Sequence, residues 1–223
     1  METDFIYWRH KTPAGIEVEE ICGADDKPAS VWLQLALQVY GENGKERFRI
    51  IDHTDSGAPL LEDSCQRISV SHTPHFLCIA QLPRTPEADL NVFNPRTAMG
   101  IDCEKSDREQ VLKIRERFLS ERELSSIPAD NVEANVLAWT CKEAIYKAAL
   151  TPGLDFRACI ELKRLPAICD HPGPLRADAP SPFGEAVVIR ADAPDIELTL
   201  YSYRSEGHII TLAYSPKCAK YKS

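Results

Sequence analysis

The 223-residue chain is long enough for one large domain or two small lobes with a buried core. It is 43% hydrophobic and 27% charged, as in soluble globular proteins, and its formal net charge of −8 argues against a general nucleic-acid-binding protein. The N-terminus has early acids, and no apolar run reaches the roughly 20 residues that span a bilayer, so we expect neither a signal peptide nor a membrane segment.

The cysteines point to a reducing compartment. The chain has eight of them and no C-x-x-C pair, which argues against a zinc site. Several lie in apolar stretches such as HFLCIAQL, which is typical of buried free thiols, with disulfides as the alternative. We therefore expect a cytoplasmic protein.

The first half of the chain carries weak signals for secondary structure. The first thirty residues show no clear pattern, and SVWLQLALQVY (30–40) fits a helix or a buried strand, its length favouring the helix. Residues 45–63 suggest a strand, a turn at Asp55-Ser56-Gly57 and a short return strand. Two further strands are predicted within residues 66–82, around a turn at Ser71-His72-Thr73-Pro74.

A proline-rich connector is predicted over residues 83–98, and we place the boundary between two lobes at its end. MGID (99–102) then predicts an apolar strand. Ser106 and Glu109 fit an S-x-x-E capping box, so we expect a helix to begin there, and SERE (120–123) repeats the pattern before a second, short helix.

A longer third helix is expected from Asp130 to Leu150, where Thr151-Pro152-Gly153 ends it. The alternating stretches of the tail, EAVVIRA, IELTLYSYR and HIITLAYS, predict strands of an antiparallel sheet. A proline-rich loop, residues 170–182, precedes them.

Asp102 and Glu104 lie one residue apart in MGIDCE (99–104). If the strand continues through them, both side chains point to the same side. Such a pair on its own is more often a pair of solvated charges than a ligand set.

The third helix places Glu143 and Lys147 among apolar side chains. At about 100° per residue they share a sector with Val132, Val136, Trp139 and Leu150, whereas Asn131, Asn135 and Lys142 form the sector expected to face water. A buried charge needs a partner, so these two residues indicate a counter-charge or a metal. The alternative is an ordinary i,i+4 pair on a helix surface.

Asp102, Glu104 and Glu143 together supply three carboxylates. This is a hard-ligand set suited to Mg²⁺, which usually completes its coordination with water and substrate phosphates. Lys147, one turn from Glu143, would lie beside such a phosphate.

These residues fall in a recognisable order. GIDCE (100–104) followed by WTCKEAIYKA (139–148) resembles the signature of the phosphopantetheinyl transferases. RFLSERE (117–123) is similar to the segment between the family's two motifs, ISVSH (68–72) to its S-H motif, and DSGAPLL (55–61) to its G-x-P turn. Length and upstream motifs resemble the larger, two-lobed monomeric class rather than the small trimeric class.

The resemblance implies an α+β fold of two pseudo-symmetric lobes, residues 1–98 and 99–223, each a small antiparallel sheet packed on a long helix. It implies a monomeric holo-[carrier protein] synthase. Such an enzyme transfers the 4′-phosphopantetheine arm of coenzyme A to a serine of an acyl or peptidyl carrier protein and releases adenosine 3′,5′-bisphosphate. Fatty-acid, polyketide and nonribosomal peptide carriers are all compatible with the sequence.

The resemblance also implies site roles. Asp102, Glu104 and Glu143 would bind Mg²⁺, and Lys147 would contact the pyrophosphate or assist the leaving group. Glu143 is the preferred base for the carrier serine, with an activated water as the alternative. Coenzyme A would be bound by Lys147 and by a set from the first lobe: Gly57, Pro59, Ser71 and His72, the last on the 3′-phosphate.

Ala58 departs from the family, which often has Lys or Arg in the middle of the G-x-P turn; Lys45, Arg47, Arg49 and Arg67 are candidate substitutes. We expect the carrier at the lobe junction and the basic residues of helix 107–119. Two other functions compete with the transferase: a non-catalytic binding or scaffold protein that retains the fold, and a magnesium-dependent nucleotide phosphohydrolase.

Overall fold

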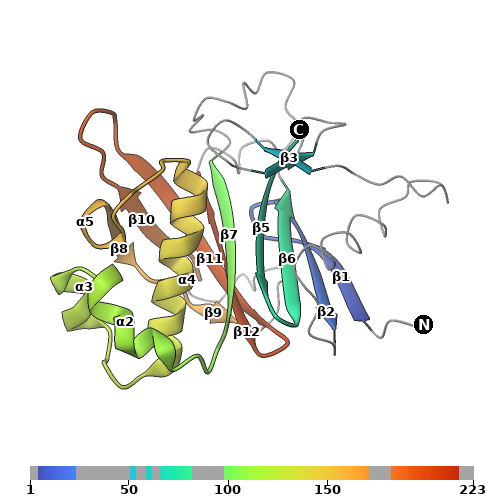
Figure 1. Ribbon diagram of the computed structural model, residues 1–223, viewed down its shortest axis with the longest axis horizontal. Helices are drawn as coiled ribbons and strands as arrows, with labels where there is room; N and C mark the ends of the chain where they lie inside the picture. The colour runs from blue at the N-terminus through green and yellow to red at the C-terminus, as the bar shows by residue number, and fades with distance from the viewer. Residues whose placement is uncertain are drawn as a thin grey trace.

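The computed structural model places two antiparallel sheets side by side, with one long helix packed on the second (Figure 1). It describes residues 5–23, 51–53, 59–61, 66–81, 98–170 and 182–215. The first sheet has the order β1-β2-β6-β5-β4-β3. Its strands are β1 (Phe5–Lys11), β2 (Glu17–Gly23), β3 (Ile51–His53), β4 (Pro59–Leu61), β5 (Gln66–Thr73) and β6 (Phe76–Gln81).

The second sheet has the order β7-β12-β11-β10-β8, and β9 pairs with β11 in parallel. Its strands are β7 (Met99–Lys105), β8 (Ile160–Arg164), β9 (Ile168–Cys169), β10 (Gly184–Val188), β11 (Ile196–Ser205) and β12 (His208–Tyr214). The helices are α2 (Gln110–Phe118), α3 (Glu121–Ser126), α4 (Val132–Ala149) and α5 (Phe156–Cys159). The predicted α+β class is confirmed. The helix expected at residues 30–40 and the connector at 83–98, apart from Ala98, lie outside the described residues.

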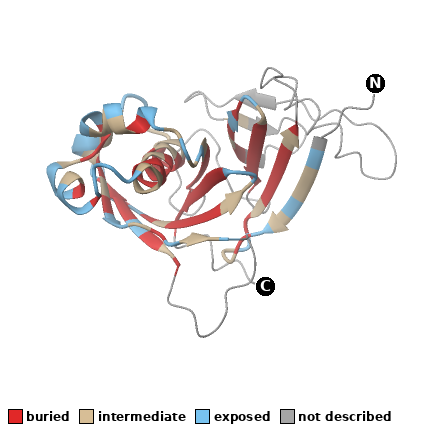
Figure 2. Cartoon of the chain, turned by 90° about the horizontal axis from the view of Figure 1, so that it is seen from below, coloured by how far each residue is buried: buried red, intermediate tan, exposed pale blue. Residues whose placement is uncertain are grey.

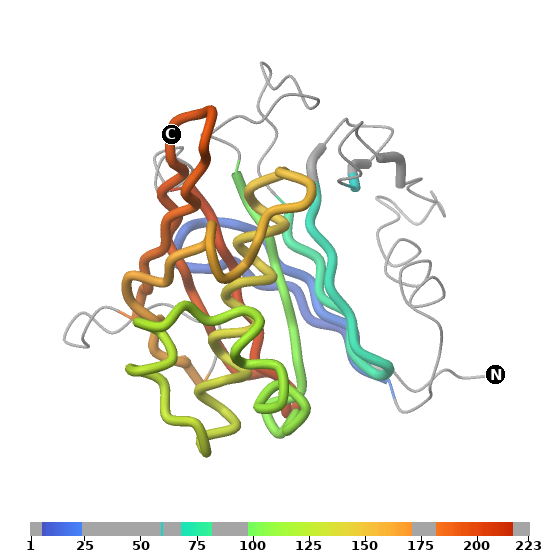
Figure 3. The backbone as a smooth tube through the Cα atoms, turned by 60° about the vertical axis from the view of Figure 1, so that its left-hand side comes forward, coloured from blue at the N-terminus to red at the C-terminus, as the bar shows by residue number. Residues whose placement is uncertain are grey.

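Strand β7 lies between two hydrophobic cores because its side chains alternate between two faces. Met99, Ile101 and Cys103 join the core between the sheets, with Phe76 of β6 and Tyr203 of β11 among its members. The opposite face of the second sheet packs against α4. Figure 2 shows buried residues along the facing strands and around α4, and Figure 3 shows the helices on the far side of the second sheet from the first.

Gly100 is the point where β7 and α4 approach most closely. A Cβ built there would lie 2.1 Å from the Ala144 carbonyl oxygen, 2.6 Å from the Ala148 nitrogen and 2.9 Å from the Lys147 Cβ. Two of these contacts are helix backbone, which cannot rotate away. The glycine of the G-I-D motif is therefore required so that α4 can lie directly on the strand that carries Asp102.

We expect Gly100→Ala to destabilise the protein by about 3 kcal/mol or more, because overpacking here must displace a helix rather than a side chain. Thermal or urea unfolding of the purified variant measures the loss. Ile101→Val changes the opposite face of the same strand and should cost only about 1 kcal/mol. Equal losses for the two variants would contradict the close-approach argument.

Local signals predicted the later elements well. Ser120 caps α3 in a complete capping box with Glu123, as the SERE pattern predicts. Helix α4 ends at Leu150, which adopts a left-handed conformation (φ 50°), and the three predicted tail strands are β10, β11 and β12. The N-cap of α4 is Asn131, one residue after the expected start at Asp130.

Two local expectations were wrong, and one stretch without a predicted pattern contains regular structure. Ser106 caps no helix, because its hydroxyl donates to the Gly207 carbonyl, and α2 starts at Gln110 without a side-chain cap. The turn expected at residues 71–74 lies two residues later, because β5 continues to Thr73. The first thirty residues, which had no clear pattern, contain the β1–β2 hairpin.

Candidate functional site

Three elements meet at Asp102. The residue lies near the middle of β7, which is an edge strand of the second sheet among the described strands. On one side α4 carries Glu143 and Lys147, and on the other β5 of the first sheet carries Ser71. The structure therefore brings together residues that lie far apart in the sequence.

The two oxygens of Asp102 have different surroundings. Oδ1 accepts hydrogen bonds from the Ser71 hydroxyl and from Lys147 Nζ, each at 2.8 Å. Oδ2 is buried and has no hydrogen-bond partner among the described residues. A buried carboxylate oxygen without a donor is costly, so this atom is suited to bind a cation.

Lys147 is held beside Asp102 by two bonds. Its Nζ donates to Asp102 Oδ1 and, at 3.1 Å, to the Ile101 carbonyl oxygen. Burial alone would lower the pKa of this ammonium, but the charge and hydrogen bond of Asp102 raise it above its ordinary value. Lys147 is therefore a fixed positive charge at the site.

Glu104, two residues along β7, is turned toward a different partner. It forms an ion pair with Arg108 and accepts a hydrogen bond from Trp139 of α4. Its pKa is raised, chiefly by burial and further by the charge of Asp102, while Arg108 and Trp139 act against the shift. The Trp of the W-x-x-K-E-A segment thus binds the second acid of the G-I-D-x-E segment.

The pKa of Glu143 is strongly raised. Burial and the charge of Asp102 raise its pKa to about 7, with a further contribution from Glu104, and Lys147 offsets part of the rise. A carboxylate with this pKa can accept a proton near neutral pH, which is what a general base requires.

This shift gives a pH-dependent prediction for the metal-free protein. The unfolded chain releases the Glu143 proton near the ordinary pKa of 4.5, whereas the folded protein holds it to about 7. The folded state binds more protons in that interval, so stability falls as pH rises through it. In EDTA we expect Glu143→Gln to raise the melting temperature relative to wild type at pH 8, with no difference near pH 4.

Thermal melts across this range measure the effect. Glu116→Gln removes an exposed carboxylate of α2 and serves as the control for the loss of one surface charge. A Glu143→Gln difference that does not change between pH 4 and pH 8 would show that folding does not raise the pKa of Glu143.

The charges of the three acids affect the pKa values of Glu104 and Glu143, but the three carboxylates do not point toward a common metal position. Among the described residues no group of three or more His, Cys, Asp or Glu side chains is arranged to hold a metal ion. Glu104 faces Arg108, and one oxygen of Asp102 is already occupied. The residues nonetheless fit a cation chemically, because Asp102 Oδ2 lacks a donor and both glutamates have raised pKa values.

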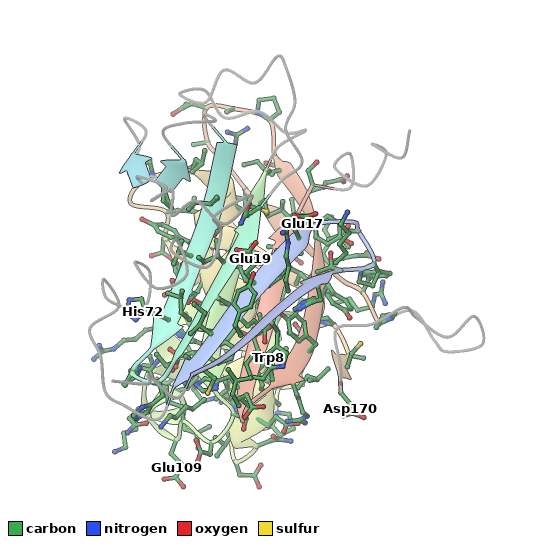
Figure 4. The ribbon with its side chains drawn as sticks, turned by 90° about the vertical axis from the view of Figure 1, so that its right-hand side faces the viewer. Trp8, Glu17, Glu19, His72, Glu109 and Asp170 are labelled. Carbon is green, nitrogen blue, oxygen red and sulfur yellow. The ribbon has the colours of Figure 1, made fainter. Side chains whose placement is uncertain are left out.

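The two residues of the S-H motif lie on opposite faces of β5. Ser71 is buried against β7, whereas His72 is exposed on the outer side of the first sheet (Figure 4). Pro59 begins β4 and is half-buried, and Gly57 lies outside the described residues. Of the proposed substitutes for the basic turn residue, Lys45, Arg47 and Arg49 also lie outside them.

Lys142 corrects the expectation of a water-facing sector on α4. Its ammonium is completely buried, and Nζ donates to Glu123 Oε2 at 2.8 Å and to the carbonyls of Phe156 and Ile160. Asn135 is buried as well and binds Arg115. Asn131, the N-cap of α4, is exposed as expected, whereas Asn135 and Lys142 are buried because α2, α3 and α5 cover this part of the helix (Figure 3).

Sequence reasoning missed two residues that contact a site acid and one residue beside the site. Arg108 and Trp139 bind Glu104, and Ser69, which lies outside the site, bonds to the backbone of β7. Trp139 shares the helix sector of Glu143, which could have indicated it. Arg108 gave no signal, because its spacing of four from Glu104 spans a turn rather than a helix.

The fold and the site together define a two-sheet α+β protein with three acids on a strand and on the long helix packed against it. The sequence model of the ACPS family, the 4′-phosphopantetheinyl transferase superfamily, matches residues 98–212, just over half of the chain. The chain belongs to this superfamily, and its family activity is phosphopantetheinyl transfer. The matched range contains Asp102, Glu104, Glu143 and Lys147, whereas the first sheet precedes it.

Two further findings complete the description. A search of curated proteins found no match. None of the helices in the described part of the chain is both long and apolar enough for a membrane span.

Proposed function

We propose that the protein transfers the 4′-phosphopantetheine arm of coenzyme A to a serine of an acyl or peptidyl carrier protein, in a magnesium-dependent reaction. The observation that carries the proposal is the asymmetric Asp102, whose Oδ2 lacks a donor beside a fixed Lys147 and a Glu143 with a pKa of about 7. Phosphoryl transfer depends on positioning and on charge stabilisation. Asp102 supplies a carboxylate for a metal ion, Lys147 a positive charge and Glu143 a base.

Asp102, Glu104 and Glu143 are the proposed ligands. To bind the metal, Glu104 would have to break its ion pair with Arg108. The Arg108 guanidinium is partly exposed, so it can move into solvent when the pair breaks. Mg²⁺ bound there would neutralise charge on the pyrophosphate of coenzyme A.

The chain's own groups have separate proposed roles. The carrier serine oxygen forms a bond to the phosphorus that carries the pantetheine arm, and the bond to the departing adenosine 3′,5′-bisphosphate breaks. Glu143 accepts the serine proton, directly or through water, and Lys147 lies beside the leaving phosphate. The raised pKa of Glu143 supports the first role, and the ion pair with Asp102 supports the second.

For coenzyme A we propose contacts from Lys147, His72, Gly57 and Pro59. Ser71, which the resemblance also assigns to coenzyme A, has its hydroxyl bonded to Asp102 and to the Cys103 N–H. The exposure of His72 leaves its ring accessible to a phosphate. We propose residues 1–98 and 99–223 as the two lobes of a cytoplasmic monomer.

The carrier is proposed to dock near α2. Two of the basic residues expected to meet the carrier are already engaged. Arg115 of α2 binds Asn135 and the Ile127 carbonyl, and Arg108, which precedes α2, binds Glu104. Lys113 and Arg117 are exposed, so these two would meet an acidic carrier.

Incubation with coenzyme A, Mg²⁺ and an apo carrier protein, followed by mass spectrometry of the carrier, tests the proposal. We expect a gain of one phosphopantetheine that EDTA prevents. Coenzyme A binding without transfer to any of several carriers would favour the non-catalytic binding protein. Release of a nucleotide product without carrier modification would favour a phosphohydrolase.

A further inference from the structure

The free edge of β7 is closed by serine hydroxyls of the first sheet. Ser69 Oγ accepts a hydrogen bond from the Ile101 N–H at 2.9 Å, and Ser71 Oγ accepts one from the Cys103 N–H at 3.2 Å. Alternate N–H groups of an edge strand point away from its sheet and need acceptors. The two serines, two residues apart on β5, provide them in place of a neighbouring strand.

Only one of the two serines reaches the site. Ser71 uses its proton to donate to Asp102 Oδ1, so its hydroxyl accepts from one residue of β7 and donates to the preceding one. Ser71 is 7% exposed and Asp102 6% exposed, so water competes little for this bond. Ser69 makes the same kind of backbone bond, and within the described part of the chain its hydroxyl makes no hydrogen bond to a site acid.

We infer that Ser71 is a positioning residue, which holds Asp102 through Oδ1 so that Oδ2 is presented to the metal ion. This inference rests on the proposed function and assigns Ser71 a role other than contact with coenzyme A. Ser71 and Lys147 both bind Oδ1, from opposite sides of β7, and leave Oδ2 as the oxygen without a donor. The first sheet thereby determines how the second sheet binds its metal.

The two serines offer a matched comparison. Ser69→Ala and Ser71→Ala each remove one backbone acceptor from β7, but only Ser71→Ala releases Asp102. Binding of Mn²⁺, measured by electron paramagnetic resonance of the free ion with and without coenzyme A, reports on the metal site directly. Coenzyme A affinity in EDTA reports on a direct contact, and thermal melts establish that each variant is folded.

We expect Ser71→Ala to weaken Mn²⁺ binding about tenfold, as is typical when a partner of a metal ligand is lost. Ser69→Ala should leave Mn²⁺ binding unchanged, and Ser71→Thr should restore it because the hydroxyl is retained. Coenzyme A affinity in EDTA should be the same in all variants and wild type.

Equal weakening of Mn²⁺ binding by Ser69→Ala and Ser71→Ala would overturn the inference, because it would show a purely structural role. A loss of coenzyme A affinity in EDTA with unchanged Mn²⁺ binding would also overturn it and assign Ser71 to coenzyme A. Absence of Mn²⁺ binding to wild type would overturn it as well. If wild type binds Mn²⁺ through Ser71-held Asp102 but modifies no carrier, the inference stands and the proposed function fails.

Discussion

Asp102→Asn should lower the rate of pantetheine transfer by about 10²–10³-fold while leaving the protein folded. The amide keeps an oxygen that can accept from Ser71 and Lys147, so the packing of β7 is preserved. What disappears is the negative charge and, with it, the anionic oxygen offered to the cation. The loss corresponds to about 3–4 kcal/mol of transition-state stabilisation.

Initial rates of carrier modification, followed by mass spectrometry, measure the effect. Asp107→Asn is the control, because this exposed acid lies just beyond the end of the same strand and should behave as wild type. If Asp102→Asn retains more than half of the wild-type rate, Asp102 has no role as a ligand.

A large effect on stability is also expected at Lys142, which the proposed chemistry does not use. Lys142→Met keeps the length of the side chain but leaves Glu123 buried without its cation, since both residues are nearly inaccessible. Breaking a buried ion pair from one side costs about 3–5 kcal/mol, which for a chain of this size lowers the melting temperature by about 10 °C. The carbonyls of Phe156 and Ile160 also lose a donor.

Urea denaturation of the variants tests this expectation. Arg164→Met breaks the exposed pair with Glu185 and should cost about 0.5 kcal/mol or less. Adding Glu123→Gln to Lys142→Met should recover part of the loss, because the amide is neutral yet still accepts from the Leu162 nitrogen. A loss below about 1 kcal/mol for Lys142→Met would mean that Glu123 finds another partner.

Lys142 and Glu143 are adjacent yet have unrelated environments. About 100° of helix rotation separates them, which directs Lys142 into the helices that cover α4 and Glu143 toward the acids of β7. The K-E pair of the W-x-x-K-E-A segment therefore joins a residue that stabilises the fold to a residue that we propose for the chemistry.

What the sequence could predict was local. The strands of the tail show apolar alternation, and the Ser120 capping box is complete within four residues. The acid pair of β7 and the helix sector of Glu143 and Lys147 follow from periods of 2 and 3.6. These features depend on neighbouring residues alone, so no knowledge of the packing was needed.

What the sequence could not predict depends on distant partners. Lys142 was expected to face water because a helical wheel shows only the residues of one helix. Its partners, the Glu123 carboxylate and the Ile160 carbonyl of β8, lie on other elements. Strand β2 was missed because it buries two acids. One of them, Glu20, accepts hydrogen bonds from Tyr203 and Ser205 of the other sheet. Such partners become visible only when the sheets are placed together.

Because Ser69 and Ser71 accept hydrogen bonds from the edge of β7, two backbone amides of this strand report on the contact between the sheets. The N–H groups of Ile101 and Cys103 are bonded to hydroxyls of β5, whereas by strand alternation those of Gly100 and Asp102 face β12. Separation of the two sheets would expose the first pair to solvent and leave the second protected. Hydrogen exchange at odd and even positions of one strand thus distinguishes motion between the sheets from unfolding of the second sheet itself.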